Sequence, residues 1–174
     1  MTMTLIETKT LGTAASTLSF TSIPQDGTDL VILFSGRRSV DSVEVRLQFN
    51  GDTGSNYTTR RLFGGGGAAA SDSSSTTYLP FYAVVNSAST SNTFSNAQFY
   101  IPNYTGSTTK SVSADTVTEN NGVEAYTQIT AGLWNNTAAI TSFSLFASSG
   151  NLEVGTTASI YKITTGSDGI VTTS

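Results

Sequence analysis

The chain has 174 residues, of which only 11% are charged, and its net charge is −4. It contains neither cysteine nor histidine, which excludes disulfides, thiolate metal sites and histidine-based acid–base catalysis. Its eight lysines and arginines form no dense cluster of the kind that tracks nucleic-acid phosphates, and no apolar run approaches the roughly 18–20 residues of a membrane-spanning helix. We therefore expect a protein with no cofactor and no metal, bound neither to nucleic acid nor to a membrane.

Apolar and polar residues alternate with a period of two along much of the chain, as in half-buried β-strands. In chain order, this pattern predicts strands at 5–11, 17–23, 29–36, 43–50, 57–63, 78–85, 96–102, 109–117, 124–133 and 139–147, with a last one near 157–163. Turn signals such as Asn50-Gly51 separate the runs, and no window gives an amphipathic helix. The pattern indicates an all-β fold: an antiparallel β-sandwich, jelly-roll-like, with about ten short strands.

Three of these runs predict which side chains face the core. The run Leu30–Phe34 is apolar on both faces, as in a strand at the centre of a sheet or under a partner subunit. In the run 43–50 the apolar residues are expected inside, namely Val43, Val45, Leu47 and Phe49. In the run 127–133 the same alternation predicts that Ile129 faces the core, with Gln128 and Thr130 on the opposite face.

We expect a single domain over residues 1–174, with two irregular segments and an N-terminal arm. Residues 64–77 (GGGGAAASDSSSTT) carry no large apolar side chain that burial could fix, which predicts a flexible loop. Residues 1–10 are expected to form an N-terminal arm, and we expect this arm and the loop to become ordered on assembly. Residues 165–174 are expected to form a disordered tail.

Two loops carry residues that could bind a ligand. Gly64–Gly67 lacks the Gly-Lys-Ser/Thr ending and the following helix of a phosphate-binding loop, so we interpret it as a loop tip. The segment Asn50–Asn56 has oxygen-bearing side chains at alternate positions, as some calcium loops do, but Asp52 is its only carboxylate. We therefore favour a tight hairpin connection with Asx-type hydrogen bonds over a metal site.

Three acidic residues lie close in sequence: Asp115, Glu119 and Glu124. Such a group raises the hypothesis of a glycosidase, which needs two carboxylates facing each other across a sugar cleft. The residues after Glu119 are Asn-Asn-Gly, however, and this pattern is typical of a turn in which carboxylates are solvated. We therefore predict no catalytic residue and no enzymatic activity.

Five residues are candidates for a subunit interface: Arg37, Arg38, Arg60, Arg61 and Trp134. The two arginine pairs lie at or after strand ends, where they could form salt bridges across an interface or keep the strand ends in solvent. Trp134 ends an alternating strand and is expected at an exposed rim. Aromatic residues could stack on sugar rings or pack in the core, and they are Tyr78, Phe81, Tyr82, Tyr100, Tyr104 and Trp134.

Several segments carry a family resemblance, in this order: Leu18–Pro24; Asp29–Leu33 with Arg37; Arg46–Tyr57 (RLQFNGDTGSNY); Ile101–Tyr104 with Lys110; and Gly132–Trp134, leading through Ile140 to Gly155–Ile163. Together they resemble a family of short β-rich structural proteins of tailed phages, often marine and cyanobacterial phages. The resemblance spans about residues 5–163, and its most distinctive part is FNGDTGSNY. Members often carry a histidine before the second strand and another after the Asn-Tyr pair, where this chain has Thr28-Asp29 and Thr58-Thr59-Arg60.

The resemblance implies a β-sandwich component of a virion, frequently assembled as a trimer, and it implies no catalytic residue. We expect a non-enzymatic virion structural protein, namely a capsid cement or decoration protein that binds the outside of a tailed-phage head and stabilises it. Its expected partners are the major capsid protein and, in a homotrimer, further copies of itself. Its expected location is the capsid surface of the virion, after synthesis in the host cytoplasm. The alternative is a head- or tail-fibre domain that recognises host-surface glycan.

Overall fold

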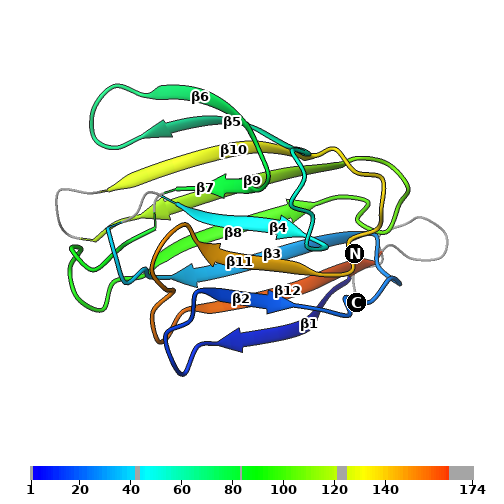
Figure 1. Cartoon of the computed structure of the whole chain (residues 1–174), viewed down its shortest axis with the longest axis horizontal. Coiled ribbons are helices and arrows are strands. Elements are labelled where there is room, and N and C mark those ends of the chain that lie inside the picture. The colour runs from blue at the N-terminus through cyan, green and yellow to red at the C-terminus, as the bar shows by residue number, and fades with distance from the viewer. Residues whose placement is uncertain (1, 42–43, 83, 121–124, 165–174) are drawn as a thin grey trace.

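The computed structural model describes residues 2–41, 44–82, 84–120 and 125–164. In this part of the chain there is no helix, and twelve antiparallel strands form two sheets (Figure 1). In spatial order, the eight-stranded sheet contains β1 (Thr2–Thr10), β12 (Thr157–Thr164), β3 (Asp29–Gly36), β8 (Ser95–Ile101), β9 (Lys110–Thr118), β10 (Tyr126–Trp134), β5 (Tyr57–Gly64) and β6 (Ala70–Thr76). The four-stranded sheet contains β2 (Thr17–Phe20), β11 (Phe143–Ala147), β4 (Val45–Phe49) and β7 (Leu79–Phe81).

The two sheets enclose one apolar core, which confirms the predicted all-β, antiparallel β-sandwich. The alternation in the sequence sets which face is buried: Val45, Leu47 and Phe49 of β4 all point into the core, as predicted. Val43 lies outside the described residues. The sequence predicted about ten strands, and the jelly-roll connectivity stays a prediction.

Strand β3 is central, as the sequence predicted from its doubly apolar run. It lies between β12 and β8, and Leu30, Ile32 and Phe34 enter the core. Val31 points to the opposite face and is buried there, with its neighbours Tyr161 and Tyr100 on either side. Leu33 on the same outer face is half-buried and Ser35 is exposed, so neighbouring side chains cover this face only in part.

Strand β10 has the opposite orientation from the one predicted. Ile129 lies on the outer face with 61% of its surface exposed, whereas Gln128 and Thr130 point inward and are 2% and 5% exposed. The prediction was wrong because it assumed an apolar interior along the whole sheet. At this end of the sandwich the interior is polar, and its side chains are joined by hydrogen bonds.

The segment predicted as an irregular loop contains a strand, and so does the expected N-terminal arm, where the sequence also predicted a strand at 5–11. Within the expected loop 64–77, residues Ala70–Thr76 form β6, which pairs with β5 along its whole length. Within the expected N-terminal arm 1–10, residues Thr2–Thr10 form β1, which pairs with β12 at the opposite edge. The expected tail 165–174 lies outside the described residues.

The four-stranded sheet covers one face of the larger sheet, while the described residues form no second layer on its other face (Figure 1). Strand β7 contacts β10 and β5, and it approaches β10 where Gly132 leaves room for Leu79. Strand β6 extends beyond this sheet at the top of the view in Figure 1. Among the described residues there is no helix long and apolar enough to cross a membrane.

Candidate assembly surface on the β5–β6 hairpin

Strands β5 and β6 form a hairpin that projects from one end of the sandwich (Figure 1). Its register runs from Tyr57 opposite Thr76 to Phe63 opposite Ala70, without a break. The connection contains the last three glycines of the four-glycine run, Gly65–Gly67, since Gly64 ends β5. Gly66 has φ = 88°, a conformation that glycine adopts without steric cost. The glycine run therefore forms the turn of a hairpin.

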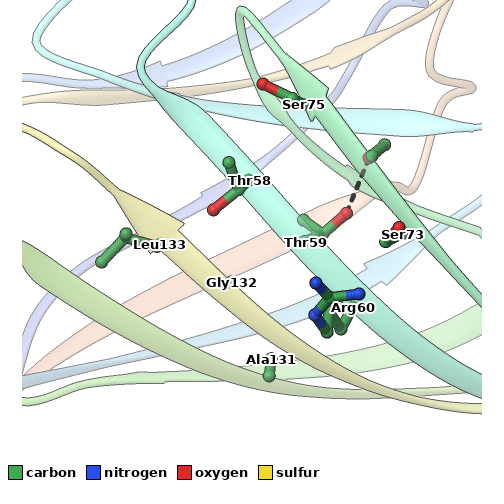
Figure 2. Close-up of a pocket in the computed structure, with 9 residues that line it drawn as sticks. Thr58, Thr59, Arg60, Ser73, Ser75, Ala131, Gly132 and Leu133 are labelled. Atoms are coloured by element: carbon green, nitrogen blue, oxygen red, sulfur yellow. Dashed lines mark hydrogen bonds between the residues drawn. The ribbon is translucent and has the colours of Figure 1, made fainter.

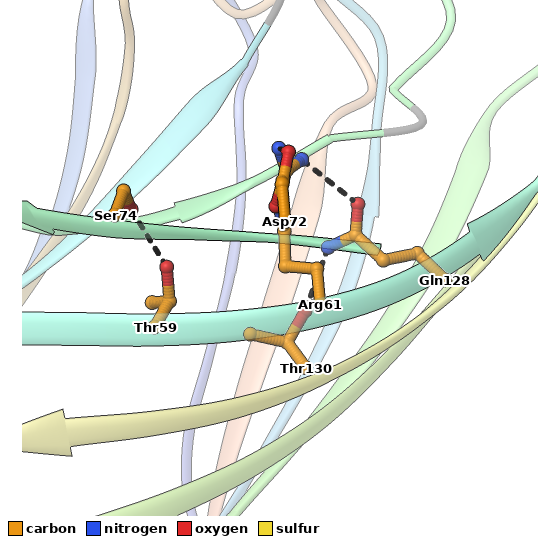
Figure 3. A network of polar contacts seen from close by, with 6 residues as sticks. All are labelled: Thr59, Arg61, Asp72, Ser74, Gln128 and Thr130. Atoms are coloured by element: carbon orange, nitrogen blue, oxygen red, sulfur yellow. Dashed lines mark hydrogen bonds and ion pairs between the residues drawn. The ribbon is translucent and has the colours of Figure 1, made fainter. Parts of the chain in front are cut away.

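The inner face of this hairpin is held to β10 by a polar network (Figure 3). Arg61 on β5 donates from Nε to Asp72 Oδ1 on β6 at 2.7 Å, and its Nη2 contacts the other carboxylate oxygen. Arg61 Nη1 also reaches Oε1 of Gln128 at 3.5 Å, and Gln128 donates to Oγ1 of Thr130 at 2.7 Å. One guanidinium thus connects three neighbouring strands, which fixes the position of the outermost strand.

An aromatic ring covers the same guanidinium from the inner side. Tyr82 lies 3.6 Å from Arg61 Cζ, measured to the ring centroid, which is a close cation–π contact. Burial, together with a hydrogen bond to Glu44, raises the pKa of Tyr82 to about 12. Glu44 also accepts from Arg46 Nε at 2.6 Å. Arg61 and Tyr82 are therefore engaged within the chain, although the Asp72 side chain on the same face is 41% exposed.

The outer face of the hairpin forms a shallow hollow of about 460 Å³ (Figure 2). Its floor is Ala131, Gly132 and Leu133 of β10, and its sides carry hydroxyl groups together with the Arg60 side chain. The outward hydroxyls belong to Thr58, Ser73 and Ser75. Those of Thr59 and Ser74 bond each other on the inner face (Figure 3). Beside the hollow, Leu62 and Ile129 face each other across β5 and β10 and are 54% and 61% exposed. This surface combines small polar groups, one cation and an exposed aliphatic pair.

The free edge of β6 differs from the three other sheet edges. Strand β1 has a register shift between Leu5 and Glu7, and it also carries the charged residue Lys9. Strand β2 has four residues, and Lys9 Nζ donates to its Ser19 carbonyl at 2.6 Å. Strand β7 has three residues, one of which is Pro80. Bulges, lysines, prolines and short length all discourage pairing with another chain, and β6 has none of them.

The structure places the predicted interface residues in different environments. Arg37 donates to the carbonyl oxygens of Ser89, Thr90 and Thr93, and Arg38, 4% exposed, donates to the Val84 carbonyl. Both therefore hold the segment between β7 and β8, and an interface role for them stays a prediction. Arg60 is exposed in the outer hollow and Arg61 belongs to the inner network, so an interface role for these two stays a prediction.

Trp134 is fully buried, which corrects its predicted rim position. Its ring packs against Phe49 at 5.5 Å and Tyr57 at 6.3 Å between centroids. Its Nε1 donates to Oδ2 of Asp52 at 2.7 Å. The sequence did not show this because the alternation in β10 was read with the wrong face inside.

The distinctive segment Asn50–Asn56 links the two sheets, since β4 and β5 belong to different sheets. The predicted hairpin is therefore wrong, whereas the predicted Asx-type bond is present: Asp52 Oδ1 accepts from the Gly54 amide at 2.8 Å. Asp52 also accepts from Asn56 and Trp134. Burial would raise the pKa of Asp52, but its hydrogen bonds outweigh this effect and lower it to about 2.

These donors leave Asp52 in a structural role. Its oxygens face N–H groups, which repel a cation, and the described residues contain no group of three or more acidic side chains that could hold a metal ion. Asp115 is exposed on the outer face of β9, and Glu124 lies outside the described residues. The structure therefore shows no pair of carboxylates facing each other among the described residues of this group.

Most aromatic side chains considered for sugar stacking are used inside the fold. Phe81, Tyr104 and Trp134 are buried. Tyr78 lies against Arg46 at 4.1 Å and Tyr82 against Arg61 at 3.6 Å, in each case measured from Cζ to the ring centroid. The hydroxyl of Tyr100 donates to Asp29 at 2.6 Å. These rings therefore do not form an open stacking platform.

Comparison of the chain with protein-family models, with curated proteins and with solved structures found no match in any of the three.

Proposed function

We propose that this chain is a non-enzymatic structural protein of a virion, and that it decorates the outside of a tailed-phage head. The observation that carries the proposal is the unblocked β6 edge on a projecting hairpin, beside an outer sheet face without a second layer. Such an edge can accept an extended segment of another protein, because its unpaired main-chain N–H and C=O groups can form β-sheet hydrogen bonds with that segment. The assignment to a tailed-phage head rests on the resemblance of the sequence to the phage structural-protein family.

The proposed partner is the major capsid protein, and the proposed assembly is a homotrimer on the capsid surface. Many identical copies on a lattice bind by multivalency, so that modest affinity at one contact is sufficient. The polar, weakly charged outer face supports this reading, since it presents serine and threonine hydroxyls rather than a catalytic constellation. Stabilisation of the head would follow from burial of surface between neighbouring capsid subunits.

A binding assay tests the proposal. Heads from a phage lacking this gene are incubated with the purified chain and separated by sedimentation, with isolated tails as the matched control. We expect the chain to sediment with heads and not with tails, and to raise the temperature at which the heads release DNA. A chain that stays in the supernatant with heads contradicts the proposal.

A second candidate function is recognition of host-surface glycan by a head- or tail-fibre domain, and the outer hollow favours it. Arg60 and the surrounding hydroxyls could bind the hydroxyl and carboxylate groups of an acidic sugar. The engagement of the aromatic rings inside the fold weakens this candidate. A glycan array probed with the wild-type chain and with Arg60→Ala tests it: binding lost in the variant supports the hollow as the site, and absence of binding removes the candidate.

A further inference from the structure

We propose that β6 pairs with β6 of a second copy of this chain. The two strands would run antiparallel about a two-fold axis, so that two eight-stranded sheets become one continuous sheet. This inference concerns the free chain in solution and rests on its geometry alone. It uses the same β6 edge that the proposed function assigns to a capsid segment, so binding to the head would displace the second copy. The occupant of the β6 edge in solution would be the chain itself.

The first argument is that three of the four sheet edges carry features that prevent pairing with another chain, whereas the β6 edge does not. An edge strand exposes a row of unpaired N–H and C=O groups, and natural proteins block such rows with bulges, charges or proline. Here β1 has a bulge, β7 has Pro80, and β2 is short and accepts a hydrogen bond from Lys9. Strand β6 keeps seven residues in unbroken register with β5. Its side chains are alanine, serine, threonine and a single aspartate, whose charge is paired with Arg61 of β5. The edge left open is thus the most regular one.

The second argument is that β6 is self-complementary in one register. When Ser73 lies on the two-fold axis, all seven residues are paired, and Asp72 lies opposite Ser74 of the partner subunit, whose hydroxyl can donate to the carboxylate. A shift by two residues that centres on Asp72 would place two carboxylates opposite each other, which is destabilising. Length and charge therefore select the register centred on Ser73.

The third argument is that the charged side chains near β6 would cause little repulsion between the two copies. Asp72 is already paired with Arg61 of its own chain. Arg60 lies on β5, opposite Ser73 of β6. The two β6 strands would lie between Arg60 and Arg60 of the partner subunit, so three strand spacings of about 4.8 Å would separate the two residues. At about 14 Å this separation exceeds the Debye length of roughly 8 Å at physiological salt, and the repulsion is largely screened.

Charge substitutions at the axis test the inference. Ser73→Lys places two lysines opposite each other, and Ser73→Glu places two glutamates, whereas a mixture of the two variants restores attraction. We expect the wild-type chain to sediment at equilibrium with twice the 18.2 kDa chain mass at high-micromolar concentration. Each variant alone should raise the dimer dissociation constant at least tenfold, and the equimolar mixture should recover the dimer. Circular dichroism verifies that each variant is folded.

Ser113→Lys is the matched control, because Ser113 is exposed on the same outer face but lies on β9, away from the edge. This control should dimerise as the wild type does. A wild-type chain that stays monomeric at high-micromolar concentration overturns the inference, and so does a dimer that both Ser73 variants leave unchanged. A mass three times that of the chain, unaffected by either Ser73 variant, overturns it in favour of a trimer built on other surfaces.

Discussion

The indole nitrogen of Trp134 donates a hydrogen bond to the carboxylate of Asp52 at 2.7 Å, across 82 positions of the sequence. Asp52 lies in the segment between β4 and β5, and Trp134 ends β10, so the bond ties the crossing between the two sheets to the core. Nearby, Asn50 has φ = 51° and its Oδ1 accepts from the amides of Thr141 and Ser142. The most distinctive segment of the sequence is therefore explained by the fold rather than by a ligand.

Removing the charge of Asp52 should alter the acid stability of the protein. The folded-state pKa of about 2 lies below the ordinary value of 3.8, so folding favours the ionised carboxylate. This contribution is complete above about pH 4 and is lost as the pH falls toward 2. We expect Asp52→Asn to unfold at lower urea concentration at pH 7 and to lose less stability than the wild type between pH 4 and 2. Asp115→Asn, on the exposed outer face, makes the same charge change, and an identical pH response of the two variants would contradict the assignment.

Trp134→Phe should raise the pKa of Asp52 toward its ordinary value, because the variant removes one of the donors that stabilise the carboxylate. The acid transition should move to higher pH, and stability at pH 7 should fall by about 2–3 kcal/mol through the lost bond and the smaller ring. In a double-mutant cycle with Asp52→Asn, urea unfolding should give a coupling energy of about 1–2 kcal/mol. Additive effects of the two substitutions would show that the bond contributes nothing.

Arg61→Met should loosen the β5–β6 hairpin. The substitution keeps the apolar stem but leaves Asp72 and Gln128 without their guanidinium donor, which should cost about 1–2 kcal/mol. Amide hydrogen exchange should accelerate in β6 more than in β3. Arg60→Met is the matched control, since Arg60 is the neighbouring exposed residue, and its effect should stay within about 0.5 kcal/mol. Equal effects of the two variants would contradict the proposed role of the network.

The sequence predicted the strands that carry one apolar face. Strand β3 has the predicted bounds, and β4 places its alternating apolar residues in the core as expected. These predictions succeeded because burial on one face imposes a period of two on the sequence. Strand β6 was missed for the same reason, since it is exposed on both faces and its serines carry no periodic signal. Only its pairing with β5 makes it a strand.

The candidate surface was harder to predict than the fold. Arg61 and Gln128 meet through the pairing of β5 with β10, and nothing in either local sequence indicates this partner. The burial of Gln128 reversed the predicted faces of β10, which in turn placed Ile129 on the outer surface and Trp134 inside. Alternation is usually interpreted on the assumption that apolar residues face the interior. One polar patch in the interior was enough to exchange the predicted inner and outer faces of β10.

The copy number of this chain per virion tests the central claim most directly. Particles would be purified by density gradient and analysed by quantitative mass spectrometry against the major capsid protein. We predict hundreds of copies per particle, in a fixed ratio to the capsid lattice. A dozen copies would instead indicate a tail or vertex appendage, and a complete absence from purified particles would contradict the claim that the chain is a virion protein.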